Sequence, residues 1–241
     1  MEINQMRNRK TEIDREIMTI QGSSLTEETF EKLKELIDES VNLEIRLEAE
    51  ARRAERLLEE SRVGVRFRSR TFDNFDGLAF PTAHTKAIEY AIRFESNKGE
   101  GLLFTGNPGT GKTHLAAAIT NYIATELKIP VRFAGFADLL ESIKRKFNSD
   151  DDLVKEFGTV PLLVIDDLGK ERTSEWSNSV LYRIVNMRYE HCLPIVITTN
   201  ETIPELNRRV GEATVSRLME MCDGISMNGE DYRMKKLGGM K

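Results

Sequence analysis

Hydrophobic residues in the first quarter of the chain recur mostly at three- and four-residue steps. One series runs from Ile3 to Ile20 and stops at a Gly-Ser-Ser break at residues 22–24, and a second runs from Phe30 to Leu58. This spacing places apolar side chains on one face of a helix. The sequence therefore predicts two helices that form a hairpin or a coiled-coil arm. Such an arm is either a dimerisation or spacer element or a partner-binding module.

The pattern changes at residue 63. Residues 63–80 are basic and rich in phenylalanine, and they predict a linker that docks on the next domain. From residue 81, short apolar runs alternate with amphipathic stretches, which predicts an α/β fold whose parallel sheet is covered by helices on both faces. Three parts are thus expected, at 1–62, 63–80 and 81–241. We expect strands at 101–105, 130–133, 160–165 and 194–198, and helices at 83–95, 112–127, 137–147 and 175–190.

Composition narrows the classes of protein that this pattern allows. The 241 residues are 39% hydrophobic and 31% charged, which permits a core and argues against a disordered chain. The net charge of -5 argues against a uniformly basic nucleic-acid-binding surface. No apolar run is long enough to span a bilayer, and the polar N-terminus does not resemble a signal peptide. Cys192 and Cys222 are spaced neither as a zinc site nor as a disulfide framework, so we expect a cytoplasmic protein with no membrane partner.

The segment GNPGTGKT matches the phosphate-binding pattern G-x-x-x-x-G-K-[ST], and we call residues 106–113 the phosphate loop. It follows an apolar strand pattern and opens a helix pattern, which is the setting the motif requires. Its glycines let the backbone amides wrap around phosphates at a helix N-terminus. Lysine would reach the β- and γ-phosphates of ATP, and threonine would coordinate Mg²⁺. The residues predicted to bind ATP are Gly106, Asn107, Pro108, Gly109, Thr110, Gly111, Lys112 and Thr113.

Polar residues also follow two later apolar runs. LLVIDDLG predicts a buried strand ending in Asp166 and Asp167, and ligands bind at the carboxyl ends of such strands. Asp166 would hold Mg²⁺, and Asp167 would polarise the attacking water. PIVITTN ends in Asn200, which would orient that water or sense the γ-phosphate. Aspartate and asparagine are also common in turns, so only the combination with the phosphate loop favours a site.

Two arginines are candidates for contact with phosphates. A guanidinium supplied by a neighbouring subunit stabilises a transferring phosphoryl group, and Arg217 in ATVSRLM is the candidate for that role. Arg233 in EDYRMKK is a candidate contact to the nucleotide of its own chain. Both side chains also fit a simple solvent-exposed position.

Together these segments resemble the bacterial helicase loaders of the DnaC type, which are AAA+ ATPases. The resemblance rests on GLLFTGNPGTGKTHLAAAI, LLVIDDLG, ITTN, the SRL of residues 216–218 and TFDNFD, and it covers residues 70 to about 235. The transposition helper ATPases of the IstB type share this core and are similar in the same segments. The resemblance implies a three-layer αβα P-loop AAA+ domain preceded by a partner-binding region.

The resemblance also implies roles for individual residues. Asp166 and Asp167 match the second nucleotide motif, and Asn200 matches the first sensor. Arg217 matches the arginine finger that acts on a neighbour's ATP, and Arg233 falls near the position of a second sensor. Most AAA+ proteins carry glutamate where Asp167 stands. The shorter side chain implies slow water activation, which suits a switch better than a fast motor.

Loaders of this group bind single-stranded DNA through a helix that follows the second strand. The corresponding region of this chain has three adjacent cations beside an aromatic ring, which suits a phosphate track with a stacking platform. A solvent-exposed helix face would show the same pattern. The acidic run at residues 150–152 predicts an exposed loop just beyond. The residues predicted to contact DNA are Lys144, Arg145, Lys146 and Phe147.

The resemblance implies an ATP-dependent helicase loader. Residues 1–62 would bind a hexameric replicative helicase, and ATP would bridge the subunits of a self-assembled oligomer. No cysteine precedes Cys192, so the N-terminal region has no zinc module of the kind that some relatives carry. One alternative is an IstB-type helper that binds duplex DNA for a transposase. The other is a degenerate ATPase that acts only as an adaptor, against which intact Lys112, Thr113 and Asp166 argue.

Overall fold

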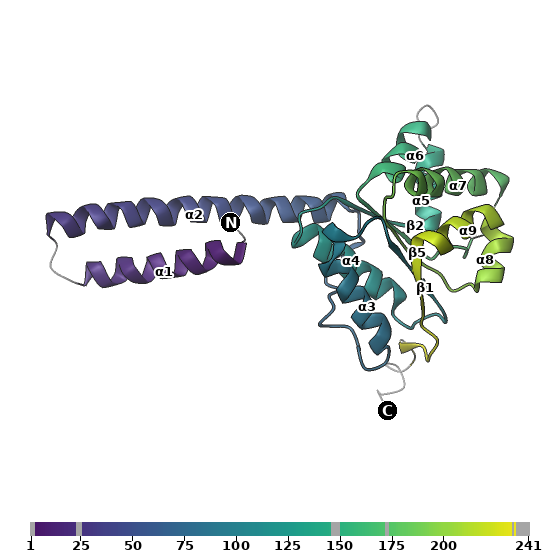
Figure 1. The fold of residues 1–241 in the computed structure, drawn as a ribbon, viewed down its shortest axis with the longest axis horizontal. Helices are drawn as coiled ribbons and strands as arrows, with labels where there is room; N and C mark the ends of the chain where they lie inside the picture. Colours follow the sequence, from purple (N-terminus) through teal and green to yellow (C-terminus); the bar gives the residue numbers. More distant parts are fainter. Residues whose placement is uncertain (1–2, 23–25, 146–149, 172–173, 233, 235–241) are drawn as a thin grey trace. The chain divides into compact units, whose positions relative to one another are not determined.

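The computed structural model describes residues 3–22, 26–145, 150–171, 174–232 and 234. The chain divides into two compact units, Met1–Arg56 and Leu57–Lys241, which we call the helical unit and the α/β unit (Figure 1). Among the described residues, no helix is both long enough and apolar enough to cross a membrane.

The helical unit contains α1 (Ile3–Gln21) and most of α2 (Glu27–Glu60). Thr26 caps α2, because its backbone N–H donates to Oγ1 of Thr29 at 2.7 Å and its own Oγ1 accepts from the Thr29 N–H at 3.3 Å. The two helices bury a narrow apolar face between them, as their spacing predicts. The fully or nearly buried side chains of this small core are Met6, Ile13, Leu36 and Leu43.

Polar contacts flank this small core. Arg9 donates from Nε and Nη2 to the two carboxylate oxygens of Glu39 at 2.9 and 3.0 Å, so the pair is bidentate. The hydroxyl of Ser40 donates to Asp14 at 2.9 Å, and Lys10 donates to the other oxygen of Asp14 at 3.0 Å. Since these charges are largely exposed, the pairs contribute little to stability.

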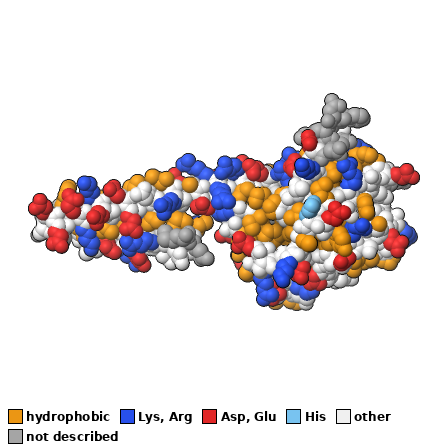
Figure 2. All heavy atoms as spheres, turned by 45° about the horizontal axis from the view of Figure 1, so that its top comes forward, with side chains coloured by type: hydrophobic (Ala, Val, Ile, Leu, Met, Phe, Trp, Pro, Cys, Tyr) orange, Lys and Arg blue, Asp and Glu red, His pale blue; other side chains and the backbone are white. Residues whose placement is uncertain are grey.

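A second apolar stripe on α2 stays uncovered within the helical unit. Its residues follow one another at intervals of seven and four, so they share one face of the helix, whereas Leu36 and Leu43 pack against α1. In the space-filling view, hydrophobic side chains are mixed with acidic and basic ones over this unit (Figure 2). The α2 stripe consists of Phe30, Ile37, Val41 and Ile45, which are 41% to 60% exposed.

The α/β unit is built on one five-stranded sheet with the order β2-β3-β4-β1-β5. Every neighbouring pair is parallel, which confirms the predicted parallel sheet. The first four strands lie within two residues of their predicted positions, and β5 was not predicted. The strands are β1 (Gly101–Thr105), β2 (Val131–Gly135), β3 (Leu162–Asp166), β4 (Ile195–Thr198) and β5 (Cys222–Ser226).

Helices cover both faces of the sheet (Figure 1), and the fold is the predicted three-layer αβα arrangement. One apolar cluster joins α3 (Pro81–Ile92) and α4 (Lys112–Thr125) to one face. A second cluster joins the remaining helices to the other face. These are α5 (Phe136–Arg145), α6 (Asp150–Thr159), α7 (Glu175–Glu190), α8 (Ile203–Val210) and α9 (Glu212–Met221); the short 3₁₀ helices are η1 (Val65–Phe67) and η2 (Phe94–Ser96).

The loop predicted for residues 150–152 is wrong, because α6 begins at Asp150. Acidic residues are favourable in the first turn of a helix, where they face the positive end of its dipole. The helix is anchored by Leu153, Val154 and Phe157, whose three- and four-residue spacing buries them in the core. The acidic run therefore marks a helix start.

The linker segment 63–80 is tied to α3 and α4 through its backbone carbonyls. Asn121 on α4 donates its amide N–H groups to the carbonyls of residues 67, 68 and 70 at 2.8 to 3.2 Å. Nε2 of His84 lies 2.9 Å from the Phe72 carbonyl, and Nε2 of His114 lies 2.9 Å from that of Thr71. Burial lowers the pKa of His114, so this imidazole is neutral at pH 7.

Arg188 on α7 connects the starts of two strands and is fully buried. Its guanidinium donates to the carbonyls of Phe157 and Val160 at 2.9 Å and to that of Pro194 at 2.6 Å, with a longer bond of 3.4 Å to Pro161. These carbonyls lie at the end of α6 and just before β3 and β4. The arginine therefore joins three segments at the amino-terminal ends of the strands, and the phosphate loop lies at their carboxyl ends.

Candidate functional site

The phosphate loop lies between β1 and α4, as its motif requires. Gly106, Gly109 and Gly111 have φ values of 125°, 76° and 98°, which L side chains rarely adopt. A Cβ at any of them would also collide with neighbouring atoms; the one at Gly111 would meet the ring of Phe75. The chain therefore needs glycine at these positions both for the turn and for the close approach of the backbone.

Lys112 begins α4 and is buried. Its ammonium donates to the carbonyls of Gly106 at 2.8 Å and Asn107 at 2.7 Å, and Thr110 Oγ1 lies 3.5 Å away. Thr110 itself donates to the Asn107 carbonyl at 2.9 Å. The positive charge is thus held inside the loop that the motif assigns to phosphates.

The two residues predicted to hold Mg²⁺ meet in the structure. Oγ1 of Thr113 donates to Oδ1 of Asp166 at 2.8 Å, although the residues come from α4 and β3. Thr198 at the end of β4 donates to the same oxygen at 2.5 Å. Burial raises the pKa of Asp166, while these hydroxyl donors act in the opposite direction. A buried carboxylate of this kind gains from a nearby cation.

Sequence reasoning did not single out Thr198. Its hydroxyl also accepts from the backbone N–H of Asp167 at 3.0 Å, so it organises both aspartates. The only signal was its place at the end of an apolar run, and the β3–β4 pairing is what brings it to Asp166.

Asp167 and Asn200 lie just beyond the carboxyl ends of β3 and β4. Asp167 has a φ of 56°, a left-handed conformation that aspartate tolerates better than most residues. Its carboxylate is partly exposed, and Lys170 Nζ lies 3.4 Å from Oδ2. Asn200 is exposed just beyond β4. Unusual backbone angles of this kind are common at functional sites.

Arg217 lies on α9 against α7. Its Nε donates to Asn186 at 2.9 Å, and Nη2 donates to the Tyr182 hydroxyl at 3.1 Å. The guanidinium carbon is 4.9 Å from the ring centroid of Tyr182 and 5.5 Å from that of Tyr189. The structure therefore places Arg217 among residues of α7 rather than at the phosphate loop of its own chain.

The basic residues of α5 are only partly described. Lys144 lies over the indole of Trp176 on α7, with Nζ 4.8 Å from the ring centroid, and Arg145 donates to Glu141 at 2.6 Å. The indole was missed by sequence reasoning because it lies 32 positions away on another helix. Three predicted residues, Lys146, Phe147 and Arg233, lie outside the described residues.

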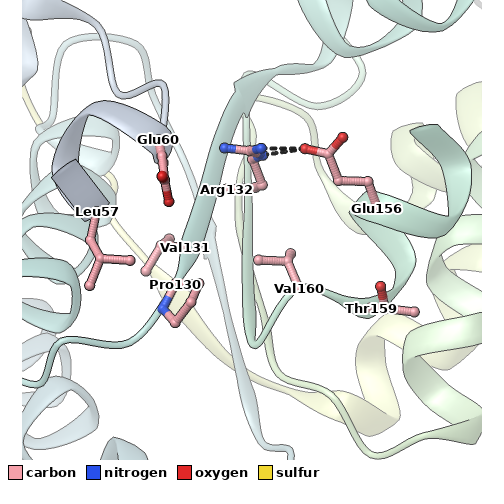
Figure 3. Close-up of a pocket in the computed structure, with 8 residues that line it drawn as sticks. All are labelled: Leu57, Glu60, Pro130, Val131, Arg132, Glu156, Thr159 and Val160. Atoms are coloured by element: carbon pink, nitrogen blue, oxygen red, sulfur yellow. Dashed lines mark hydrogen bonds and ion pairs between the residues drawn. The ribbon is translucent and has the colours of Figure 1, made fainter. Parts of the chain in front are cut away.

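A cavity of about 200 Å³ lies at the other end of the sheet (Figure 3). Pro130, Val131 and Val160 mark the starts of β2 and β3, and an ion pair between Arg132 and Glu156 lies at its rim. Ligands of parallel sheets bind at the carboxyl ends of the strands. This cavity is therefore not the nucleotide site.

The described residues fit a phosphate chain and a divalent cation. The loop glycines, the buried Lys112 and the N-terminus of α4 together suit phosphates. Within the described part of the chain, no group of three or more His, Cys, Asp or Glu side chains could hold a metal. Thr113 and Asp166 supply only part of a magnesium shell, which matches a cation that shares phosphate oxygens and water.

The strand order, the phosphate loop and the Asp166 cluster define a P-loop nucleotide-binding protein of the AAA+ class. More specifically, the chain belongs to the family of IstB-like ATP binding proteins, whose family model matches residues 17–238. It is therefore an ATP-binding protein by family.

Relatives in this family carry different names. The chain is 31% identical over 161 residues to the replicative helicase loader DnaC of Escherichia coli K12, an alignment that covers 65% of each protein. It thus spans just under two thirds of that relative. It is 30% identical over 200 residues to the putative ATP-binding protein of insertion sequence IS5376 from Geobacillus stearothermophilus, covering 79% of this chain and 77% of the relative.

Solved structures support the same fold. The crystal structure of the DnaC helicase loader superimposes with a TM-score of 0.63 at 30% identity, covering 68% of this chain and 99% of that one. The crystal structure of DnaI gives a TM-score of 0.59 at 22% identity, a likeness that concerns the fold alone.

Proposed function

We propose that the chain is an ATP-dependent loader that delivers a replicative DNA helicase to single-stranded DNA. The observation that carries the nucleotide chemistry is the contact between Thr113 and Asp166, two motif residues that are far apart in sequence. The loader assignment is supported by the similarity to the DnaC loader.

In this proposal, each described site residue performs one task. Lys112 and the loop amides bind the β- and γ-phosphates, and Thr113 and Asp166 hold Mg²⁺ through the hydroxyl and the carboxylate. When bound there, Mg²⁺ would supply positive charge beside the phosphates. Asp167 accepts the proton of the attacking water, and Asn200 orients that water. Asp167 is short and partly exposed, so the turnover suits a slow switch.

Arg217 acts on the ATP of a neighbouring subunit. Its support is that Tyr182, Tyr189 and Asn186 already orient the guanidinium, which lowers the entropy lost when it engages a phosphate. ATP then joins adjacent subunits into an oligomer, and hydrolysis separates them. Arg233 remains a proposed contact to the nucleotide of its own chain.

Single-stranded DNA contacts the end of α5 in this proposal. Lys144 and Arg145 supply charge there, and Lys146 and Phe147 follow them in the sequence. The indole of Trp176 beside Lys144 adds an aromatic face of the kind on which bases stack.

The helical unit, with the end of α2 to residue 62, binds the helicase. Its support is the α2 stripe, because exposed apolar residues on one helix face are what a partner helix or groove covers. Acidic and basic side chains are mixed with the hydrophobic ones over this unit, which suits a reversible interface.

The test measures three properties of the full chain: nucleotide turnover, DNA binding by fluorescence anisotropy, and capture of a purified hexameric replicative helicase. Arg217→Ala should retain ATP binding and lower DNA-stimulated turnover by roughly a thousandfold or more. Arg183→Ala, an exposed arginine on α7, is the control. Unchanged stimulated turnover in Arg217→Ala would refute the finger assignment, and nucleotide binding without any hydrolysis would favour an adaptor.

Helicase capture has its own matched pair. Val41→Glu places a charge in the α2 stripe and should abolish capture. Met18→Glu changes an exposed apolar position on α1 and should not. Capture that survives Val41→Glu would exclude the stripe as the contact surface.

A transposition helper is the second candidate function. The observation that favours it is the similarity to the IS5376 protein, which covers more of both chains than the DnaC alignment does. A helper would prefer duplex over single-stranded DNA and would capture a transposase. Those two results together would replace the loader assignment.

A further inference from the structure

We propose that the segment after β5 is a strap that competes with nucleotide for the phosphate loop. The strap consists of residues 227–232, and its competing group is the carboxylate of Asp231. The inference depends on the nucleotide binding proposed above. It adds that the nucleotide must displace the strap before it can occupy the phosphate loop.

The position of the strap follows from the topology of the sheet. β5 is parallel to β1, with Ser226 opposite Thr105 in the last pair of the ladder. The pairing continues one residue further, since the N–H of Met227 donates to the Thr105 carbonyl at 2.8 Å. β1 leads directly into the phosphate loop. The chain that leaves β5 must therefore run beside that loop.

The strap and the loop remain in contact beyond the sheet. The side-chain amide of Asn107 donates to the Gly229 carbonyl at 3.3 Å. The N–H of Tyr232 donates to the Gly109 carbonyl at 3.1 Å. A Cβ at Gly106 would collide with the carbonyl of Met227. Successive strap residues thus follow successive loop residues in the same direction.

Asp231 brings a negative charge to the loop. A Cβ at Gly109 would collide with both oxygens of its carboxylate, so this glycine is covered by the acid. A loop at a helix N-terminus attracts anions of any kind, carboxylates as well as phosphates. The carboxylate therefore interacts favourably with the ligand-free loop and repels an incoming phosphate chain.

The neighbouring Glu230 provides an internal comparison. Its side chain is exposed, whereas that of Asp231 is partly buried beside the loop. Neutralising either one removes the same charge from the same segment. The carboxylate of Asp231 lies against Gly109 of the phosphate loop, whereas the side chain of Glu230 is exposed, so a local effect and a general charge effect are separable.

The experiment measures dissociation constants of ATP and ADP for the wild-type chain, Asp231→Asn and Glu230→Gln by calorimetry. Asp231→Asn should bind both nucleotides about three- to tenfold more tightly, as expected for one removed charge near the phosphates. Glu230→Gln should stay within about twofold. The difference should shrink in 0.5 M salt, because screening weakens the repulsion.

Hydrogen exchange tests the movement directly. Saturating ADP should accelerate exchange of the Tyr232 amide, whose acceptor is the Gly109 carbonyl. Unchanged or weaker binding by Asp231→Asn, or equal gains in both variants, would overturn the inference while leaving wild-type nucleotide binding intact. If none of the three proteins bound nucleotide, the proposed function would fail as well.

Discussion

The helical unit and the α/β unit bury their hydrophobic residues in different ways. Among its described residues, the helical unit relies on four well-buried apolar side chains between two helices, with exposed ion pairs beside them. The α/β unit has two large clusters, one on each face of a sheet whose central strands are fully buried. Unfolding of the helical unit therefore breaks few apolar contacts, whereas unfolding of the α/β unit breaks many.

This difference in packing indicates which unit can more easily change its conformation. A unit with a small core opens locally at low free-energy cost, so the helical unit could adapt to the partner proposed for it. A densely packed sheet keeps the ends of its strands in register, so Thr113, Asp166 and Thr198 stay within hydrogen-bonding distance. The proposed function therefore assigns partner binding and nucleotide chemistry to separate parts of one chain.

The largest expected effect comes from Arg188→Met in the α/β unit. The change leaves buried carbonyls without a donor, and it should lower the free energy of unfolding by about 3–5 kcal/mol. Urea unfolding followed by fluorescence measures this, because Trp176, the single tryptophan, belongs to the α/β unit. Arg183→Met on the exposed side of α7 is the control. A loss no larger than that of the control would contradict the structural role.

Ile13→Ala should have the next largest effect, confined to the helical unit. Ile13 is fully buried, and its truncation should cost about 2–4 kcal/mol. In the full chain, amide exchange should accelerate in α1 and the first half of α2, while nucleotide affinity stays the same. Met18→Ala, at an exposed position on α1, should change neither. Equal acceleration in the α/β unit would show that the two units unfold together.

Asp166→Asn should have the smallest effect on stability, with the opposite sign. Burial raises the pKa of Asp166 in the folded chain above the unfolded pKa of 3.8. The protonated side chain therefore stabilises the fold below pH 3.8, and this stabilisation is lost as the pH rises through the folded pKa. At pH 7, asparagine should therefore stabilise the ligand-free chain. Denaturant unfolding at pH 7 and pH 4 should show this gain shrinking at the lower pH. The proposed ATP hydrolysis should be lost at pH 7. A destabilised variant at pH 7 would contradict this assignment.

The sequence predicted the parts of the α/β unit whose signals are local. β1 and α7 lie where their patterns place them, and the phosphate loop follows from its motif. β5 was missed because Cys222-Asp-Gly-Ile-Ser has little apolar pattern of its own. It becomes a strand by pairing with β1. α8 and α9 are short, and no prediction covered them.

The candidate site shows the same limit. Asp166 and Thr113 belong to motifs with fixed spacing, so both could be found without a structure. Thr198 depends on the register between β3 and β4, and Asp231 depends on the continuation of the β1–β5 ladder. Neither relation is encoded within a short stretch of residues.

The order of the strands also has a consequence for synthesis of the chain. β1 pairs with β5, yet β5 leaves the ribosome more than a hundred residues later. Until then, β1 has an unpaired edge, and such edges promote aggregation. A nascent chain or proteolytic fragment that ends before Cys222 should therefore be a preferred substrate for chaperones.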